Sequence, residues 1–465
     1  MSADLYKNFT GLRICIAGAG VTGIACARAL SKRGAEIVIV DDNVPTLDEF
    51  SIVTPSAIAI SEFDRLLISP GWRESHPLVQ AARHNNVAIM NEIDFAWSIK
   101  KPQQKWIALT GTNGKTSTVE LTAQMLQHGG VSAVACGNVG TTVIDSVESS
   151  EDYNFLVLEL SSFQLHWMED AAFSAVALLN IAQDHIDWHG SFDSYAKDKL
   201  SILDRATTGV LNGDDPEIVS RATHWQGQKV FFSLDTPGPG ELGIVEELLV
   251  DRAFVADPQE AAMICELNEV QPTVPHNVSN TLAAAGLALS AGISHEALRE
   301  AITKFTPGRH RIEKVLEASG VTWIDDSKAT NPHAAGASIM SALSVIWIAG
   351  GLAKGAQMGE LVERIKSRVR VAILMGQDRE LIANEIRARA PHIQIDVVDT
   401  PTNYSRGGAD NSLMEEVVRI AHLRAVSGDT VLLAPACASM DQFISYADRG
   451  DRFKQAVEKV IAHGK

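Results

Sequence analysis

A short loop between an apolar segment and a predicted helix contains the residue types best suited to phosphate chemistry. Residues 110–118 read Thr-Gly-Thr-Asn-Gly-Lys-Thr-Ser-Thr and follow the strand-like run 106–109. Its two glycines free the backbone to wrap phosphate oxygens, Lys115 can neutralise the β- and γ-phosphates, and the Thr116 hydroxyl can bind Mg²⁺. The spacing departs from the full phosphate-loop pattern, because Leu109 stands where its first glycine would be. The loop still predicts ATP binding, by Gly111, Thr112, Asn113, Gly114, Lys115, Thr116 and Ser117.

Carboxylate and imidazole groups that suit metal-assisted phosphate chemistry occur further along the chain. Glu159 ends the apolar run 155–158, and functional groups in α/β sheets lie at the carboxyl ends of strands. It could bind Mg²⁺, or be a structural carboxylate, which would need partners because an unpaired buried charge is costly. A second strand, predicted over 176–181, precedes a segment that indicates metal or phosphate binding. That segment contains Asp184, His185, Asp187 and His189.

A glycine-rich turn near the start of the chain suggests a second phosphate site. Residues 18–23 read Gly-Ala-Gly-Val-Thr-Gly between the apolar strand 14–17 and an alanine-rich helix, and Asp41 and Asp42 close the next strand. Such glycines let a diphosphate approach a helix N-terminus. The turn is compatible with a dinucleotide, as in a nicotinamide or flavin oxidoreductase, with a nucleotide-sugar, or with a tight turn alone.

The elements that must position these residues alternate between strands and helices, which predicts an α/β architecture with parallel sheets. A polar, proline-containing stretch at 101–104 and a Pro-Gly-Arg break at 307–309 divide the chain into three predicted domains. Their predicted boundaries are 1–102, 103–306 and 307–465. Within them the patterns also predict a helix-rich stretch over 277–304, strands over 312–315 and 321–324, and a final helix over 447–463.

Composition excludes several classes of function. The 465 residues carry a formal charge of -17, which argues against nucleic-acid binding or a broad anionic-membrane surface. No basic leader precedes an apolar run, and no uninterrupted apolar stretch is long enough to cross a bilayer, so we predict a cytoplasmic protein without stable membrane insertion. The five cysteines are scattered without metal-site spacing, which predicts reduced and mostly buried thiols.

Taken together, the motifs resemble those of the Mur ligases of peptidoglycan synthesis. The phosphate loop, the strand that ends in Glu159 and the Asp184-His185 segment are shared with that family, over essentially the whole chain. Further segments are similar to its D-glutamate-adding branch: residues 18–23, 158–165, 323–331, 350–355 and 433–443. The resemblance implies three domains: a Rossmann-like N-terminal domain, a central P-loop ATPase-type domain and a C-terminal Rossmann-like domain.

By this resemblance, the first domain binds the UDP end of a UDP-linked substrate. Some members have an arginine near the uracil after the second carboxylate, and Asn43 stands at that position here. The residues that the resemblance assigns to the UDP-linked substrate are Gly18, Gly20, Val21, Thr22, Asp41, Asp42, Ser69, Gly71, Asn138, Ser161, Gln164 and His185.

The resemblance also implies a carbamylated lysine at Lys199. Addition of CO₂ turns an ammonium, which repels Mg²⁺, into an oxygen ligand. Lys197, two residues earlier, is an alternative site for this modification. The simplest alternative is that Lys199 is an ordinary, unmodified helical lysine exposed to solvent. The implied metal ligands are Thr116, Glu159, His185 and carbamylated Lys199, for two Mg²⁺ ions or for Mn²⁺ in their place. The implied catalytic residues are Lys115, Glu159, His185 and Lys199.

Nucleotide and amino-acid contacts complete the implied site. Asn277 and Asn280 share one helix face and flank the adenine, although Asn277 could only cap the helix. Arg311, with Arg309 as an alternative, Asp326 and Lys328 contact ATP. The residues implied to bind D-glutamate are Lys328, Thr330, Lys354, Ser439 and Tyr446, the last standing where the family often has phenylalanine.

The activity that the resemblance implies is ATP-dependent ligation of D-glutamate to UDP-N-acetylmuramoyl-L-alanine through an acyl phosphate, by an enzyme expected to be a monomer. Hinges near residues 100 and 306 suggest domain closure that excludes water. Alternatives are a sibling Mur ligase, a folylpolyglutamate synthetase, a nicotinamide-binding oxidoreductase or a non-catalytic nucleotide sensor. The D-N-P-[RK] motif of the lysine- and diaminopimelate-adding siblings is absent from the sequence.

Overall fold

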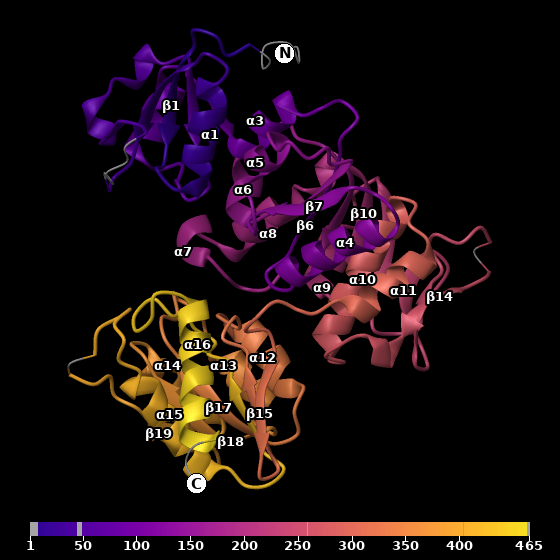
Figure 1. Ribbon diagram of the computed structural model, residues 1–465, viewed down its shortest axis with the longest axis vertical. Coiled ribbons are helices and arrows are strands. Elements are labelled where there is room, and N and C mark those ends of the chain that lie inside the picture. Colours follow the sequence, from indigo (N-terminus) through magenta and orange to yellow (C-terminus); the bar gives the residue numbers. More distant parts are fainter. Residues whose placement is uncertain (1–7, 44–48, 258, 403, 463–465) are drawn as a thin grey trace. The chain divides into compact units, whose positions relative to one another are not determined.

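The computed structural model describes residues 8–43, 49–257, 259–402 and 404–462 (Figure 1). They contain three β-sheets flanked by helices, so the α/β prediction is confirmed. By their contacts they divide into two compact units. The first comprises Met1–Ile181, Asp193–Val270 and Asn277–Phe305, and the second Ala182–Phe192, Gln271–His276 and Thr306–Lys465. The predicted domain boundaries at 102 and 306 stay a prediction.

The N-terminal sheet has the order β3-β2-β1-β4-β5, with every pair of strands parallel. Its strands are β1 (Arg13–Ala17), β2 (Glu36–Val40), β3 (Ile52–Val53), β4 (Arg65–Ile68) and β5 (Ala88–Asn91). The helices are α1 (Val21–Ser31), α2 (Pro77–His84) and α3 (Glu92–Ile99), with short turns η1 (Pro55–Ala57) and η2 (Ile60–Glu62). The predicted strand 14–17 is fully buried, as expected where helices cover a parallel sheet.

The central sheet has nine strands in the order β14-β13-β12-β11-β10-β9-β6-β8-β7. Its strands are β6 (Lys105–Thr110), β7 (Ala133–Gly137), β8 (Phe155–Glu159), β9 (Phe173–Leu178), β10 (Ala206–Asn212), β11 (Gln228–Phe232), β12 (Glu241–Val245), β13 (Leu248–Asp251) and β14 (Ala262–Glu266). The pairs from β7 to β12 are parallel, while β13 and β14 add an antiparallel edge. Parallel pairing aligns the carboxyl ends of β6, β8 and β9 at one edge of the sheet.

The helices of the central region are short apart from three that bury one face of the sheet. These three are α4 (Lys115–His128), α10 (Pro275–Ser290) and α11 (His295–Lys304), which share a large apolar core with the strands. The others are α5 (Val143–Val147), α6 (Ser162–Trp167), α7 (Ile186–His189), α8 (Phe192–Leu200) and α9 (Pro216–Arg221), with η3 (Leu203–Arg205) and η4 (Leu267–Glu269). The predicted helix-rich stretch 277–304 is therefore two helices, separated at Gly292, whose φ is +85°.

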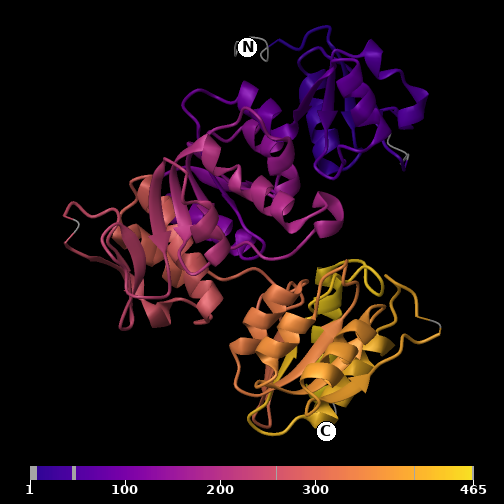
Figure 2. The ribbon, with the colours of Figure 1, turned by 180° about the vertical axis from the view of Figure 1, so that it is seen from behind.

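The C-terminal sheet has the order β15-β16-β20-β17-β18-β19, with only the β15–β16 pair antiparallel. Its strands are β15 (Glu313–Ala318), β16 (Val321–Asp325), β17 (Val345–Gly350), β18 (Val369–Met375), β19 (Gln394–Val397) and β20 (Thr430–Leu433). One face packs on α12 (Pro332–Met340), α13 (Gly359–Ile365) and α14 (Arg379–Arg389), and the other on α15 (Ser412–Arg424) and α16 (Tyr446–Val457). Helix α16 lies in front of the sheet in Figure 1 and behind it in Figure 2.

Some predicted boundaries differ from the structure. The strand predicted over 176–181 is β9, which begins earlier and ends at Leu178, because residues 179 and 180 turn to contact the phosphate loop. The final helix ends at Val457 and continues as the π-helical turn η5 (Glu458–Ala462), and residue 463 of the prediction lies outside the described residues. All five cysteines are buried free thiols, as predicted. Within the described part of the chain, no helix is long and apolar enough to cross a membrane.

Candidate functional site

The phosphate loop joins the end of β6 to the start of α4, as the motif predicts. Gly114 has a φ of +84°, and a Cβ at this position would lie 2.3 Å from Oδ1 of Asn280 on α10. A larger residue would therefore be strained and would collide with Asn280. The contact brings Asn280, a predicted nucleotide contact, to the loop. Asn277, one turn earlier, is buried inside α10, so the alternative that it caps the helix is wrong.

Asn180, which the sequence analysis missed, clamps this loop. Its side-chain oxygen accepts the Asn113 N–H at 2.8 Å, its amide nitrogen donates to the Asn113 carbonyl at 3.0 Å, and its own carbonyl accepts the Thr112 N–H at 2.9 Å. The loop is thereby held in shape by the segment after β9, the strand that neighbours β6. The available signal was a polar residue just beyond the apolar run of β9.

Two lysines converge on one carbonyl of the loop. Lys115 Nζ donates to the Gly111 carbonyl at 2.8 Å and to that of Thr112 at 2.9 Å, and Lys199 Nζ donates to the same Gly111 carbonyl at 2.8 Å. Lys199 is only 2% exposed, whereas Lys197 on the same helix is exposed. The structure thus brings Lys199 to the loop, and not Lys197.

Tyr195 lines the same corner of the site and was also missed. Its hydroxyl lies 2.9 Å from the Thr112 hydroxyl, and the Lys199 ammonium lies 4.9 Å from the centre of its ring. It precedes Lys199 by one helical turn on α8, so the two side chains share a helix face. That spacing was the available sequence signal.

Glu159 ends β8 and presents a carboxylate that is only half satisfied. Its Oε1 accepts the Asn138 side-chain N–H at 2.9 Å, while Oε2 is buried and has no hydrogen-bond partner among the described residues. Glu159 is 2% exposed, so this orphaned oxygen is costly unless a ligand uses it. Gly137 makes the approach possible, because a Cβ there would lie 2.6 Å from the Glu159 carbonyl oxygen.

An orphaned carboxylate oxygen beside a phosphate loop suits a hard cation. Mg²⁺ binds oxygen ligands and usually keeps substrate phosphates in its coordination sphere. Glu159 and the Thr116 hydroxyl offer such oxygens, so the residues present fit the metal that the sequence implies. Thr116 is the second residue of α4, beside the predicted phosphate position.

Ser161 and Gln164 have a structural task in addition to any role with substrate. They form a reciprocal capping box at the start of α6: Ser161 Oγ accepts the Gln164 N–H at 3.2 Å, and Gln164 Oε1 accepts the Ser161 N–H at 2.9 Å. Such a box stabilises the helix start. Their predicted contact with the UDP-linked substrate stays a prediction.

The glycine turn of the first domain joins β1 to α1. Gly18 has a φ of +109°, and a Cβ there would lie 2.5 Å from Oγ of Ser69. The carboxylate of Asp41 accepts the Ala19 N–H at 2.8 Å, so this residue fixes the turn. The remaining turn residues Gly20, Val21 and Thr22 are half-buried or exposed, as a turn that contacts a ligand requires. Gly71, in the turn after β4, is exposed.

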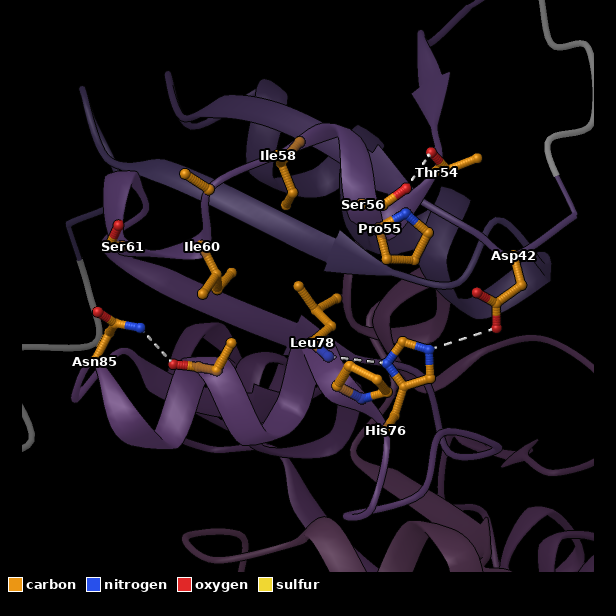
Figure 3. A pocket seen from close by; sticks show the side chains of 13 residues that line it. Asp42, Thr54, Pro55, Ser56, Ile58, Ile60, Ser61, His76, Leu78 and Asn85 are labelled. Atoms are coloured by element: carbon orange, nitrogen blue, oxygen red, sulfur yellow. Dashed lines mark hydrogen bonds and ion pairs between the residues drawn. The ribbon is translucent and has the colours of Figure 1, made fainter.

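A cavity of about 670 Å³ lies beside Asp42 (Figure 3). Asp42 and His76 face each other at one end, 3.6 Å apart, and Ile58, Ile60 and Leu78 supply apolar walls. His76 Nδ1 accepts the Leu78 N–H at 3.1 Å, which caps α2. Of the residues predicted to bind the UDP-linked substrate, Asp42 lines this cavity.

His185 belongs to the second unit and has a left-handed backbone, with a φ of +53°. Its N–H donates to the Asp184 carboxylate at 2.9 Å, and its Nε2 lies 3.6 Å from the same group. Asp184 Oδ2 also accepts the Asn331 amide at 3.5 Å. The structure therefore associates His185 with the 327–331 loop of the C-terminal domain.

Asp326, one of the predicted nucleotide residues of the C-terminal domain, is a buried carboxylate. Burial raises the pKa of Asp326 to about 6, against hydrogen bonds from the Ser338 hydroxyl and the Ile312 N–H and the charge of Arg311. Arg311 therefore acts on Asp326, while the alternative, Arg309, pairs with Asp451 on α16. Both neighbours of Arg311 have positive φ values, +64° for His310 and +48° for Ile312.

The residues predicted to bind D-glutamate lie on segments that follow neighbouring strands. Lys328 Nζ lies 3.9 Å from the centre of the Tyr446 ring, which brings these two predicted residues together. Thr330, in the same loop, donates its N–H to the Lys328 carbonyl at 2.8 Å. The segments of Lys354 and Ser439 are bridged by paired backbone bonds of 2.9 Å between Leu352 and Ala438.

Comparison with known proteins identifies the family. Three domain models match along the chain: "Mur ligase MurD-like, N-terminal domain" at 12–91, "Mur ligase middle domain" at 109–288 and "Mur ligase, glutamate ligase domain" at 310–437. The chain is 44% identical to a UDP-N-acetylmuramoylalanine--D-glutamate ligase of Thermobifida fusca, over 96% of this chain and 98% of that protein. The chain belongs to the Mur ligase family. The predicted resemblance and the three-domain fold are confirmed.

Other Mur ligases extend the comparison. A UDP-N-acetylmuramoylalanine--D-glutamate ligase of Streptomyces coelicolor is 40% identical over 98% of this chain and 100% of its own. Among solved structures, a pseudomurein peptide ligase type C from Methanothermus fervidus superposes with a TM-score of 0.60 at 17% identity, covering 97% of this chain and 100% of its own. The UDP-N-acetylmuramate-alanine ligase MurC from Thermotoga maritima superposes with a TM-score of 0.57 at 18% identity, covering 96% of this chain and 99% of its own. These two structures support the fold alone.

Proposed function

We propose that this Mur ligase joins D-glutamate to UDP-N-acetylmuramoyl-L-alanine at the expense of ATP, giving UDP-N-acetylmuramoyl-L-alanyl-D-glutamate, ADP and phosphate. The observation that carries the proposal is the arrangement at the phosphate loop, where Lys115 and Lys199 meet the Gly111 carbonyl. Full-length relatives at 44% and 40% identity that are named as this ligase support the choice of substrates. The reaction supplies peptidoglycan precursors in the cytoplasm. It thereby supports growth of the cell wall, cell shape and cell division.

Phosphate binding and charge screening fall to the loop. Its backbone N–H groups and Lys115 hold the β- and γ-phosphates, while Asn277, Asn280, Arg311 and Asp326 hold the rest of the nucleotide. Thr116, Glu159, His185 and carbamylated Lys199 would hold two Mg²⁺ ions, or Mn²⁺ in their place. When bound, these ions screen the negative charge that accumulates as carboxylate and phosphate approach.

The buried position of Lys199 supports the proposal that this side chain is carbamylated. The neutral amine attacks CO₂, a C–N bond forms, and one amine proton leaves to solvent, which gives a carbamate anion. The side chain is almost fully buried beside the loop, so the anion is placed where metal charge can compensate it. Uncarbamylated, the same amine holds the Gly111 carbonyl.

The chemistry proceeds in two steps. An oxygen of the L-alanyl carboxylate attacks the γ-phosphorus, and the bond from this phosphorus to the β–γ bridging oxygen breaks. ADP is the leaving group, and the other product is an acyl phosphate. The amine of D-glutamate then attacks the acyl carbon, and the tetrahedral intermediate expels phosphate after loss of an amine proton. Domain closure at hinges near residues 100 and 306 excludes water, which would hydrolyse the acyl phosphate.

The acidic amino acid binds on the C-terminal domain. Lys328 and Lys354 supply positive charge for its carboxylates, and Thr330, Ser439 and Tyr446 complete the contacts. The UDP end binds at the glycine turn of the first domain, through the residues the sequence implies, and Asn138 contacts the muramoyl-peptide portion. The enzyme acts as a monomer with domains at 1–102, 103–306 and 307–465.

Phosphate release tests the proposal. With Mg-ATP and UDP-N-acetylmuramoyl-L-alanine, we expect phosphate to form with D-glutamate and not with L-glutamate, L-lysine, diaminopimelate or without an amino acid. Turnover with only another amino acid would agree with the ligase reaction but overturn the assignment of D-glutamate as the substrate. Absence of nucleotide turnover with every amino acid would overturn the ligase proposal.

A further inference from the structure

Arg449, on the first turns of α16, is completely buried although it carries a guanidinium group. Nε donates to the Ser327 hydroxyl at 3.0 Å and Nη2 to the Ser327 carbonyl at 2.9 Å. Nη1 donates to the carbonyls of Cys437 at 3.1 Å and Gly350 at 3.4 Å. One side chain thus binds three separate segments of the C-terminal domain.

These three segments follow three adjacent strands. The sheet order places β16, β20 and β17 side by side. Ser327 and Cys437 come shortly after β16 and β20, and Gly350 is the last residue of β17. Lys328 follows Ser327 directly, Ser439 lies two residues after Cys437, and Lys354 four after Gly350. Arg449 therefore fastens together the segments that carry the proposed contacts to the amino acid.

The first turn of α16 reinforces this connection. The Ser327 hydroxyl donates to the Tyr446 carbonyl at 2.7 Å, and Lys328 lies over the Tyr446 ring. Displacement of Arg449 would disturb Ser327, and through it the Lys328–Tyr446 pair. The guanidinium fork suits this task, because its donors diverge in a fixed plane.

Charge gives a second reason to connect Arg449 with an anionic ligand. Within the described residues, no carboxylate forms an ion pair with it, and its partners are carbonyls and one hydroxyl. Burial lowers the pKa of Arg449 to about 10, so it is still protonated near neutral pH. The charges of Asp441 and Asp325 raise the pKa of Arg449 against this effect of burial, and an anion bound nearby adds to that compensation.

We propose that Arg449 is a positioning residue for the acidic amino-acid substrate, which fixes the segments carrying Lys328, Lys354 and Ser439 and contributes positive potential to a site for two carboxylates. This inference rests on the proposed D-glutamate ligase function. Arg449 acts through these segments.

Arg449→Lys tests the inference, because it keeps the charge but loses the fork. We expect KM for D-glutamate to rise at least tenfold, while KM for ATP stays within twofold. The matched control is Arg452→Lys on the same helix. Arg452 is also buried and also donates to backbone carbonyls, of Gly408 and Asp410, but it binds a different loop and pairs with Asp448. Its replacement should leave both constants within twofold.

The outcomes are distinct. A folded Arg449→Lys enzyme whose KM values for D-glutamate and ATP are unchanged, or rise together, would overturn the inference. If Arg449→Lys does not fold, Ser327→Ala removes one acceptor more gently and should still raise KM for D-glutamate selectively, about threefold. An unchanged value would overturn the inference. Wild-type enzyme that fails to use D-glutamate would instead overturn the proposed function.

Discussion

At the scale of single residues, replacing Glu159 should impair catalysis without lowering the stability of the fold. Its Oε2 is buried without a partner, so the folded protein retains a carboxylate that water would stabilise better. Glu159→Gln removes this charge, and its side-chain oxygen can still accept from Asn138. We expect kcat to fall at least a hundredfold and half-saturating Mg²⁺ to rise at least tenfold. The unfolding midpoint, measured by thermal denaturation without ligands, should not fall by more than a few degrees. Normal Mg²⁺ dependence would contradict the assigned role.

The two lysines of α8 form a matched pair for mutation. Lys199 is buried against the Gly111 carbonyl, and Lys197 is exposed on the same helix. Lys199→Ala should lower kcat at least a hundredfold, and Lys197→Ala should leave it within twofold, measured by phosphate release. Sequence alone left both residues open, because only packing against the loop distinguishes them. Equal effects of the two changes would refute the assignment.

Asp326 predicts a pH dependence of stability. Burial raises its pKa from 3.8 to about 6, so the folded state holds its proton more tightly than the unfolded chain. Between these values the folded state binds more protons, and stability falls as pH rises from about 4 to 6. Asp326→Asn should remove this loss, worth up to about 3 kcal/mol. Urea unfolding at pH 4.5 and 7 measures the free energy of unfolding of both proteins. The stability of the variant relative to the wild type should increase as pH rises, and an equal difference at both pH values would exclude the effect.

At the scale of elements, the strands and their functional ends could be predicted because apolar runs mark them. The loop after β6 and the carboxylate at the end of β8 both lie where the sequence places them. The clamp by Asn180 could not be predicted from the sequence, since it depends on hydrogen bonds between segments 67 residues apart. For the same reason, the end of β9 was predicted three residues too late.

Asn180 predicts how the loop responds when its clamp is removed. Asn180→Ala abolishes two side-chain hydrogen bonds to Asn113. We expect KM for ATP to rise about tenfold, equivalent to about 1.4 kcal/mol of binding free energy. Asn212→Ala is the control, because Asn212 ends the neighbouring strand β10 and donates to the Leu179 carbonyl instead. It should lower stability but leave KM for ATP within twofold, and equal KM changes would argue against the clamp.

At the scale of the whole molecule, the family could be predicted because several motifs occur in the right order, and the full-length relatives confirm it. The fold follows from the same motifs. The domain boundaries at 102 and 306 rest on linker composition instead and stay a prediction. His185 illustrates the limit: its motif adjoins the central strands, yet by its contacts it belongs with the C-terminal loop of Asn331.

The central claim is that ATP activates the alanyl carboxylate for attack by D-glutamate. The most direct test uses UDP-N-acetylmuramoyl-L-alanine with ¹⁸O in both oxygens of that carboxylate, with Mg-ATP and D-glutamate, and mass spectrometry of the products. An acyl phosphate requires one ¹⁸O to leave with phosphate and the other to remain in the new amide, so we expect singly labelled phosphate in a one-to-one ratio with the D-glutamyl product. Phosphate without label, or labelled phosphate without that product, would contradict the account.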